Sequence, residues 1–152
     1  MALGKIEGGR FRPKAAAMIL AIAATLVLSS CGGFSDAKAA AESGVATFHS
    51  QLNSGQMQAI YAGADDAFRK ATKESDFDAF MGAVQRKLGA VQQSQLRSYR
   101  VGYFTGQGTV VTMVYQTQFA GGSGAEEFSW HIQDKHPLLL RYNVDSNALI
   151  LK

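Results

Sequence analysis

The sequence predicts an α+β domain in which N-terminal helices pack on one face of a four-stranded antiparallel meander. Up to Gly89, apolar side chains recur every three to four residues, which is the period of an amphipathic helix. From Gln95 onward, apolar and polar side chains alternate, which is the period of a strand with one covered face. Short polar or glycine-rich segments separate the alternating runs, as expected for hairpin turns.

A basic and then apolar leader precedes this domain. Lys5, Arg10, Arg12 and Lys14 outnumber the one acid of the leader, and residues 15–28 are uncharged. A permanent span of a bilayer core needs roughly 20 apolar residues, so this run is too short for one. The layout predicts a secretory signal peptide.

The only cysteine of the chain lies where the apolar run ends. Leu28, Ser29 and Ser30 precede Cys31, and this pattern resembles the bacterial lipobox. The resemblance implies thioether attachment of diacylglycerol to Cys31, cleavage of the leader before it, and acylation of the new amine by a fatty acid such as palmitate. Gly32 follows where Asp would retain an enteric lipoprotein in the inner membrane, so the resemblance favours the outer membrane, with the domain facing the periplasm.

The region around Cys31 has two other interpretations. Cys31 could be a buried free cysteine, but serines and glycines flank it, and these would not bury it. Ordinary signal cleavage could occur at residues 37–39, which have a small-x-small pattern but lie far past the apolar run. The predicted division is a signal peptide over 1–30, a lipidated tether over 31–36 and one domain over 37–152.

The charge of the chain resides in its leader. Of 15 lysines and arginines four precede Cys31, and of 12 acids one does, so the remainder is neutral. Nucleic-acid binding requires a basic surface on the folded domain, so we expect no nucleic-acid partner.

The predicted helices are a long one over 36–53, a short one from 57, one or two turns over 64–70, and a third long one from Ser75 to Gly89. Four predicted strands follow, over 98–103, 111–119, 127–133 and 138–145. The side chains expected to face the helices are Tyr99, Val101, Tyr103, Val111, Met113, Tyr115, Phe119, Phe128, Trp130, Ile132, Leu138, Leu140, Tyr142 and Val144.

This order of elements resembles a known superfamily over residues 37–150. With FHSQLNSGQMQAIY early and FDAFMGAVQRKLG at the end of the helical part, the chain is similar to small bacterial domains of unknown function related to the cystatin-like, nuclear-transport-factor-two-like superfamily. The resemblance implies a curved sheet wrapped around the long helix. In some members the cone between them is a ligand pocket or an active site.

No expected inward position is Asp, Glu, His, Lys or Arg, so the sequence predicts neither an enzyme nor a cofactor. Burial of an acid or base is what shifts its pKa enough for proton transfer near neutral pH. His49, His131 and His136 are scattered without ligand spacing, which predicts no metal site. His49, next to the apolar stripe, is expected at its boundary or on the surface.

We therefore predict a membrane-anchored lipoprotein with a non-catalytic binding or interaction domain, and its oligomeric state stays open. One alternative is a carrier of a small apolar ligand in the cone, with a packed core as the competing interpretation. Another is an enzyme, which requires a one-residue slip of strand register that brings His131 or Arg141 inside. The outer sheet face is either solvated or a docking face for an envelope protein. The candidate pocket residues are Tyr99, Tyr103, Tyr115, Trp130 and Tyr142, and the candidate partner-face residues are Arg100, His131 and Arg141.

Overall fold

The computed structural model describes residues 32–150 and confirms the predicted fold class. The helices come first: α1 (Gly32–Asn53), α2 (Met57–Ala62), α3 (Asp66–Ala71) and α4 (Glu74–Leu88). The strands β1 (Val91–Phe104), β2 (Gly108–Phe119), β3 (Gly122–Gln133) and β4 (His136–Asp145) follow, and α5 (Asn147–Ile150) is last. All neighbouring strands are antiparallel and lie in the order β1-β2-β3-β4, which is a meander.

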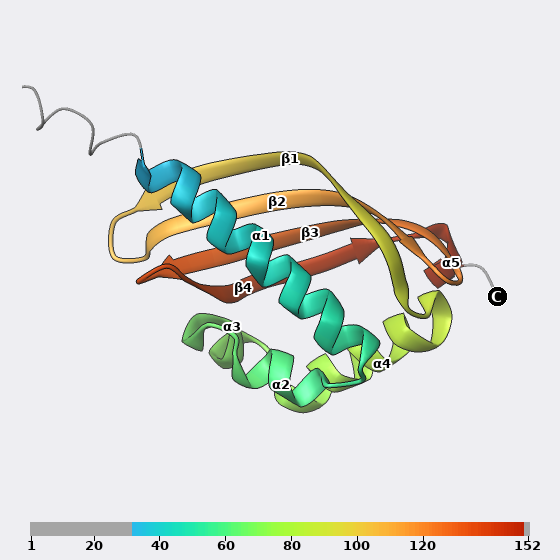
Figure 1. Ribbon diagram of the computed structural model, residues 1–152. Helices are drawn as coiled ribbons and strands as arrows, with labels where there is room; N and C mark the ends of the chain where they lie inside the picture. The colour runs from blue at the N-terminus through green and yellow to red at the C-terminus, as the bar shows by residue number, and fades with distance from the viewer. Residues whose placement is uncertain (1–31, 151–152) are drawn as a thin grey trace, which may run out of the picture. The chain divides into compact units, whose positions relative to one another are not determined.

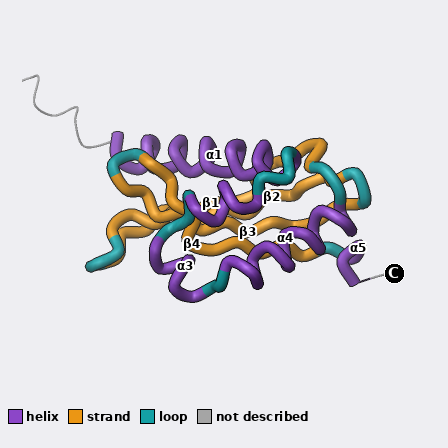
Figure 2. The backbone as a smooth tube through the Cα atoms, turned by 90° about the horizontal axis from the view of Figure 1, so that it is seen from below, coloured by secondary structure: helices purple, strands orange, loops and turns teal. Residues whose placement is uncertain are grey.

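Helix α1 crosses one face of the sheet, and α2, α3 and α4 lie along its β4 edge (Figure 1). The view from below in Figure 2 has α3 and α4 in front of the strands. The stripe of α1 is buried as predicted, because its period keeps one face against the sheet. That stripe consists of Ala41, Val45, Phe48 and Leu52.

Helix α1 begins earlier than predicted. Residues 33–36, expected in a tether, form its first turn, and they are exposed up to Ala37, the first buried residue. Extending an existing helix adds about one hydrogen bond for each residue fixed, so the helix continues past its packed part. The predicted signal peptide and Cys31 lie outside the described residues. None of the helices over residues 32–150 is long and apolar enough to cross a membrane.

The start of α4 also differs from the prediction, while its end is confirmed. Lys73 occupies the N-cap position, and Ser75, predicted to cap the helix, lies inside its first turn. Gly89 follows the last residue with a φ of 72°, a conformation that glycine adopts without strain.

A β-bulge in β4 makes part of its predicted register wrong. Ser129 pairs with Arg141 but Trp130 pairs with Leu139, so one residue of β4 has no partner. The shift turns Leu139 inward, where it is buried, and excludes Leu138 and Leu140 from the inner face. A slip of one residue exchanges the two faces of a strand, and here the exchange is confined to the strand's first half.

Two of the candidate pocket tyrosines face the predicted side but are not buried. Tyr99 pairs with the buried Met113, so both point toward the helix layer, yet Tyr99 is 51 % exposed and Tyr103 75 % exposed. The reason is that β1 is an edge strand, and burial under the helices ends at β2. Their assignment to an internal pocket is therefore wrong.

Candidate functional site

Packed aromatic rings occupy the space between α1 and the sheet. Phe128 lies at their centre, with its ring centroid 5.1 Å from that of Phe48, 5.0 Å from Tyr142 and 5.9 Å from Trp130. Tyr115 meets the same ring edge-on at 6.1 Å. Tyr115, Trp130 and Tyr142 thus lie on the inner face, where they pack against Phe128. This favours the packed core among the two interpretations of the cone.

A buried carboxylate lies within this aromatic core. Glu126 has no exposed surface, and its oxygens accept hydrogen bonds from Tyr142 (2.8 Å) and from the hydroxyl of Thr117. The third partner is His49 on α1, whose Nε2 lies 2.8 Å from Oε2 of Glu126. A carboxylate only accepts hydrogen bonds, so His49 donates here. Three donors from three elements satisfy the buried group.

Burial keeps the neighbouring phenols protonated. It raises the pKa of Tyr142 well above its usual range, and the negative charge of Glu126 adds to the effect. Burial also raises the pKa of Tyr115 to about 12, with a further contribution from Glu42. A neutral Tyr142 is required for its hydroxyl to donate to Glu126.

The prediction that no Asp, Glu, His, Lys or Arg side chain faces inward is therefore wrong, and so is the assignment of His49 to the boundary of the stripe or to the surface. Glu126 has the same parity in β3 as Phe128 and Trp130, but the predicted strand began one residue after it. His49 follows Val45 by four residues on α1, so it extends the apolar stripe. Continuing the helical period of α1 would have placed His49 on the buried face, and continuing the alternation of β3 would have placed Glu126 on the inner face.

A surface cleft opens beside the aromatic core, between α1, α2 and the β3–β4 hairpin. Its volume is about 270 Å³. We call it the α1–α2 cleft. Most of its lining is apolar, with a few hydroxyl and amide groups at the α1 side, which is the usual composition of a small-molecule site. Its lining residues are Ser43, Gly44, Thr47, Phe48, Gln51, Ala59, Ile60, Gly63, Trp130, Pro137 and Leu139.

Trp130 is the one candidate pocket residue that lines this cleft, and its indole N–H is buried without a hydrogen-bond partner among residues 32–150. An unpaired buried donor is unusual and calls for an acceptor, such as a water molecule or a ligand. The ring packs close to α1, since a Cβ atom on Gly44 would lie 3.1 Å from its Cζ3. Only glycine leaves this wall of the cleft undisturbed.

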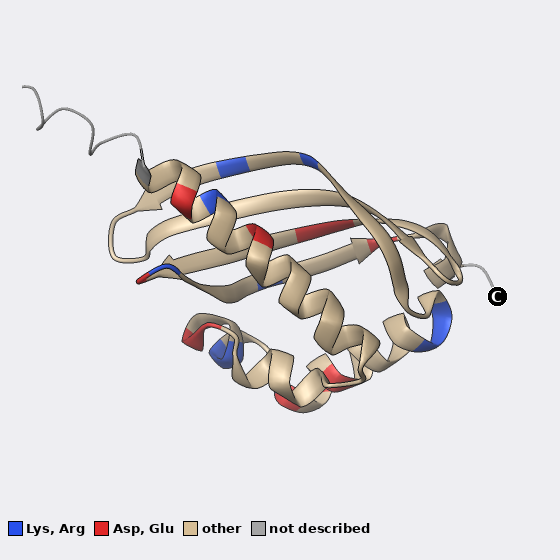
Figure 3. Ribbon diagram, viewed as in Figure 1, with Lys and Arg blue, Asp and Glu red and all other residues tan. Residues whose placement is uncertain are grey.

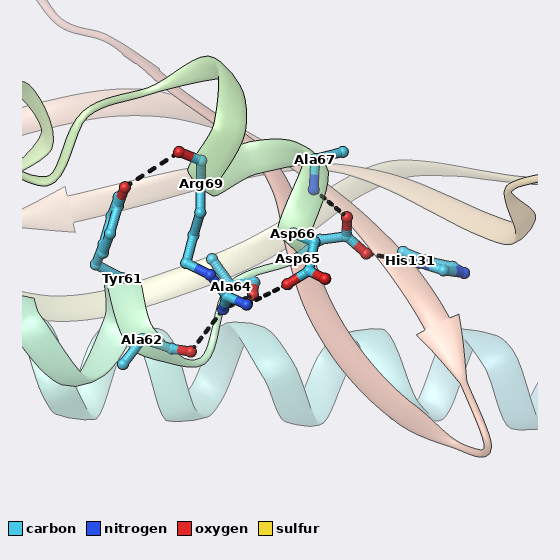
Figure 4. A network of polar contacts seen from close by, with 8 residues as sticks. All are labelled: Tyr61, Ala62, Ala64, Asp65, Asp66, Ala67, Arg69 and His131. Carbon is cyan, nitrogen blue, oxygen red and sulfur yellow. Dashed lines mark hydrogen bonds and ion pairs between the residues drawn. The ribbon is translucent and has the colours of Figure 1, made fainter.

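A second polar pair joins the sheet to the helix layer. Asp65 is the N-cap of α3: its Oδ1 accepts from the Ala67 amide at 2.7 Å, and its Oδ2 lies 2.7 Å from Nδ1 of His131 (Figure 4). The Asp65 amide also donates to the carbonyl of Leu139 at 2.9 Å. The pair thus fastens the start of α3 to β3 and β4.

Several donors stabilise the charged form of Asp65. Partial burial alone would raise its pKa, but the hydrogen bonds from His131 and Ala67 and the positive charges of His131 and Arg69 lower the pKa below its usual range. Arg69 completes the network by donating to the carbonyls of Ala62 and Ala64 and pairing with Asp66 (Figure 4).

His131 was expected on a solvated sheet face, and its side chain is instead 23 % exposed. It borders a second cleft of about 270 Å³, lined by Asp65, Asp66, Ala67, Lys70, Gly106, Gln107, His131 and Leu140. A carboxylate that orients an imidazole is half of a general-base arrangement. None of these lining residues carries a hydroxyl or thiol, and the contact that the structure shows for the Asp65 side chain besides His131 is the capping of α3.

Arg100 and Arg141 remain on the outer face of the sheet, in one row across the strands. Arg100 pairs with Thr112, Thr112 with Ser129, and Ser129 with Arg141. Both arginines are exposed. Basic and acidic residues are interspersed along the described chain (Figure 3). The three predicted partner-face residues therefore do not form one exposed surface, because the side chain of His131 is bound to Asp65.

Residues 45–137 match a family described as "Protein of unknown function (DUF4019)". The match spans more than half of the chain, so the chain belongs to this family. It includes His49, Asp65, Glu126 and His131 and ends at Pro137 on the rim of the α1–α2 cleft. No curated protein matches the sequence.

The Glu126 cluster should be indispensable for stability. Replacing His49 by Phe leaves a buried carboxylate short of a donor, which should lower the free energy of unfolding by about 3–5 kcal/mol. Urea denaturation of the purified protein measures this. The matched control is the double variant with His49→Phe and Glu126→Leu, in which no charge stays buried and much of the loss should return. A His49→Phe variant as stable as the parent would contradict the assignment.

The Asp65 interaction should depend on pH. Its pKa is lowered by folding, so its contribution is present above the usual aspartate pKa and is lost as the pH falls through the lowered value. Asp65→Asn keeps a good N-cap, removes the charge, and should destabilise by roughly 1 kcal/mol at pH 7. The difference from the parent should vanish in acid. Asp66→Asn, on the exposed neighbour, serves as control, and an equal effect of both variants would refute the prediction.

Proposed function

We propose that this member of the DUF4019 family is a membrane-anchored lipoprotein of the bacterial envelope whose domain binds a small, largely apolar ligand without catalysis. The observation that carries the binding role is the largely apolar α1–α2 cleft, whose lining includes Trp130. The anchor is supported by the sequence around Cys31, which lies outside the described residues. The two parts of the proposal are tested separately.

The cleft, and not the cone, is the proposed ligand site. The rings of Phe48, Phe128 and Tyr142 already contact one another inside the cone, so a ligand there would have to displace them. The cleft needs no such rearrangement. Its volume is at the lower end of small-molecule sites, which favours a compact ligand over a long-chain lipid.

A non-catalytic role is supported by the way the ionisable groups are used. Glu126 and His49 satisfy each other inside the core, and Asp65 both caps α3 and holds His131. These contacts give each group a structural task. An enzyme would need a nucleophile beside one of these pairs, and the residues that line the second cleft, next to Asp65 and His131, include no hydroxyl or thiol.

The anchor predicts that Cys31→Ala moves the protein from the detergent phase to the aqueous phase of a detergent extraction, or leaves the leader uncleaved. Without the thiol no diacylglycerol can be attached, and a single acyl chain alone anchors only marginally. Ser30→Ala keeps a small residue before the cysteine and serves as control. Partition of the protein without the substitution into the aqueous phase would exclude the anchor.

The cleft predicts binding of an apolar fluorescent probe next to the only tryptophan of the chain. Energy transfer from Trp130 to anilinonaphthalene sulfonate should be saturable, because Trp130 lines the site. Thr47→Phe should abolish most of this transfer by filling the cleft. Ala46→Phe places the same ring on the neighbouring exposed position outside the cleft and should leave the transfer unchanged.

Equal transfer in the two variants, or none in the parent, would count against the site. Native mass spectrometry of protein purified gently from envelopes gives a second readout, because a retained small molecule adds its mass to the chain. That added mass should be absent from the Thr47→Phe variant and present in the Ala46→Phe variant.

A further inference from the structure

Exposed aromatic side chains gather at the end of the domain where α1 begins. Phe34 is 65 % exposed, Tyr103 75 % and Phe104 53 %. We call these three residues the aromatic end. Tyr103 and Phe104 are consecutive in β1, so their side chains point to opposite faces of the sheet at this end. Large apolar side chains exposed at one end of a domain mark a surface that contacts a protein, a ligand or a membrane.

The contacts of the neighbouring residues show that these aromatics share one end. The first turn of α1 borders a surface hollow together with Thr109 and Ile132. Thr109 pairs with Tyr103, and Phe104 is the last residue of β1 before the hairpin turn. Figure 1 shows α1 starting beside the β1–β2 and β3–β4 hairpins, at the opposite end of the sheet from α5.

We propose that the aromatic end contacts the interfacial region of the lipid bilayer and so orients the domain on the membrane. This rests on the proposed function, because the lipid attached to Cys31 is what brings the bilayer to this end. Phe34 lies three positions after Cys31, a distance that even a fully extended chain spans in about 11 Å. The helix already begins at Gly32, so the chain between the anchor and the domain has almost no slack.

The chemistry of the aromatic end suits the interface. Tyr has an apolar ring and a polar hydroxyl, and it is enriched where membrane meets water. The nearby charges balance, since Asp36 faces Lys135 at 3.7 Å and Lys38 pairs with Glu42. Attraction to anionic headgroups, which needs a basic cluster, is therefore not the driving force. Contact should occur on neutral phosphatidylcholine.

The test uses the full-length lipidated protein in phosphatidylcholine vesicles that contain a nitroxide-labelled lipid. Thr105→Cys, in the β1–β2 turn, carries a fluorophore next to the aromatic end, and Asn147→Cys carries it at the opposite end. Acylated Cys31 leaves no other thiol in the chain. We expect strong quenching of the label at position 105, weak quenching at position 147, and no change when anionic lipid is added.

Removal of the aromatic end should abolish most of the quenching at position 105. The variant combines Phe34→Gln, Tyr103→Thr and Phe104→Thr, which suit a helix and a strand and replace only exposed side chains. Phe80→Gln, which removes an exposed aromatic from α4, is the control and should change nothing. Thermal unfolding confirms that each variant is folded.

The outcomes separate the two proposals. Vesicles that carry the protein but quench both labels weakly would refute the docking and leave the anchor intact. The docking would also be refuted if the fluorescence of the label at position 105 changed only when envelope proteins were added, since the partner would then be a protein. If the protein did not float with the vesicles at all, this result would contradict both the anchor and the docking.

Discussion

The structure depends on the burial of one face of α1 against the inner face of the sheet. The apolar stripe of this helix meets Phe128 and its neighbouring rings, and the strands alone would leave that face exposed to water. Burying a large apolar side chain contributes roughly 1.5–3 kcal/mol, so a stripe of such residues outweighs any single polar contact in the domain. The two clefts, the polar pairs and the exposed ends are arranged around this contact.

The same burial explains why the polar pairs are complete. A carboxylate in an apolar core is costly unless donors surround it, and Glu126 receives them from β2, β4 and α1 together. Such a cluster fixes the position of α1 along the sheet, because His49 reaches Glu126 in one register only. Asp65 and His131 do the same for α3 at the β4 edge. Orientation of the helices is thus set by two hydrogen-bonded pairs, while the free energy of packing comes from the rings.

The two proposed contacts of the domain use different parts of α1. The aromatic end lies at its first turn, and the α1–α2 cleft begins at Ser43, about 14 Å further along a helix that rises 1.5 Å per residue. A domain held at the membrane by its first turn would therefore keep the cleft clear of the headgroups. In this arrangement the helix that organises the core also separates the ligand site from the membrane.

Much of the fold could be predicted from the sequence, because helix and strand periods are local properties. The alternation around Phe128 and Trp130 marks an inner face wherever the strand pairs, and Gly89 marks the end of a helix. Errors arose where a local pattern is broken by one residue. The bulge in β4 reversed the faces around Leu139, and the inner face of β3 continued to Glu126 although its side chain is charged.

The sequence by itself determined the order of the elements, the hairpin connections and the short distance between Cys31 and the domain, since each follows from neighbouring residues. Only the tertiary structure decided which polar groups meet. His49 and Glu126 are 77 positions apart, and Asp65 and His131 are 66 apart, so neither period nor spacing relates them. It also decided that Tyr99 and Tyr103 are exposed and that Trp130 borders a cleft. Burial and cavities depend on how far one layer covers another, which no local pattern encodes.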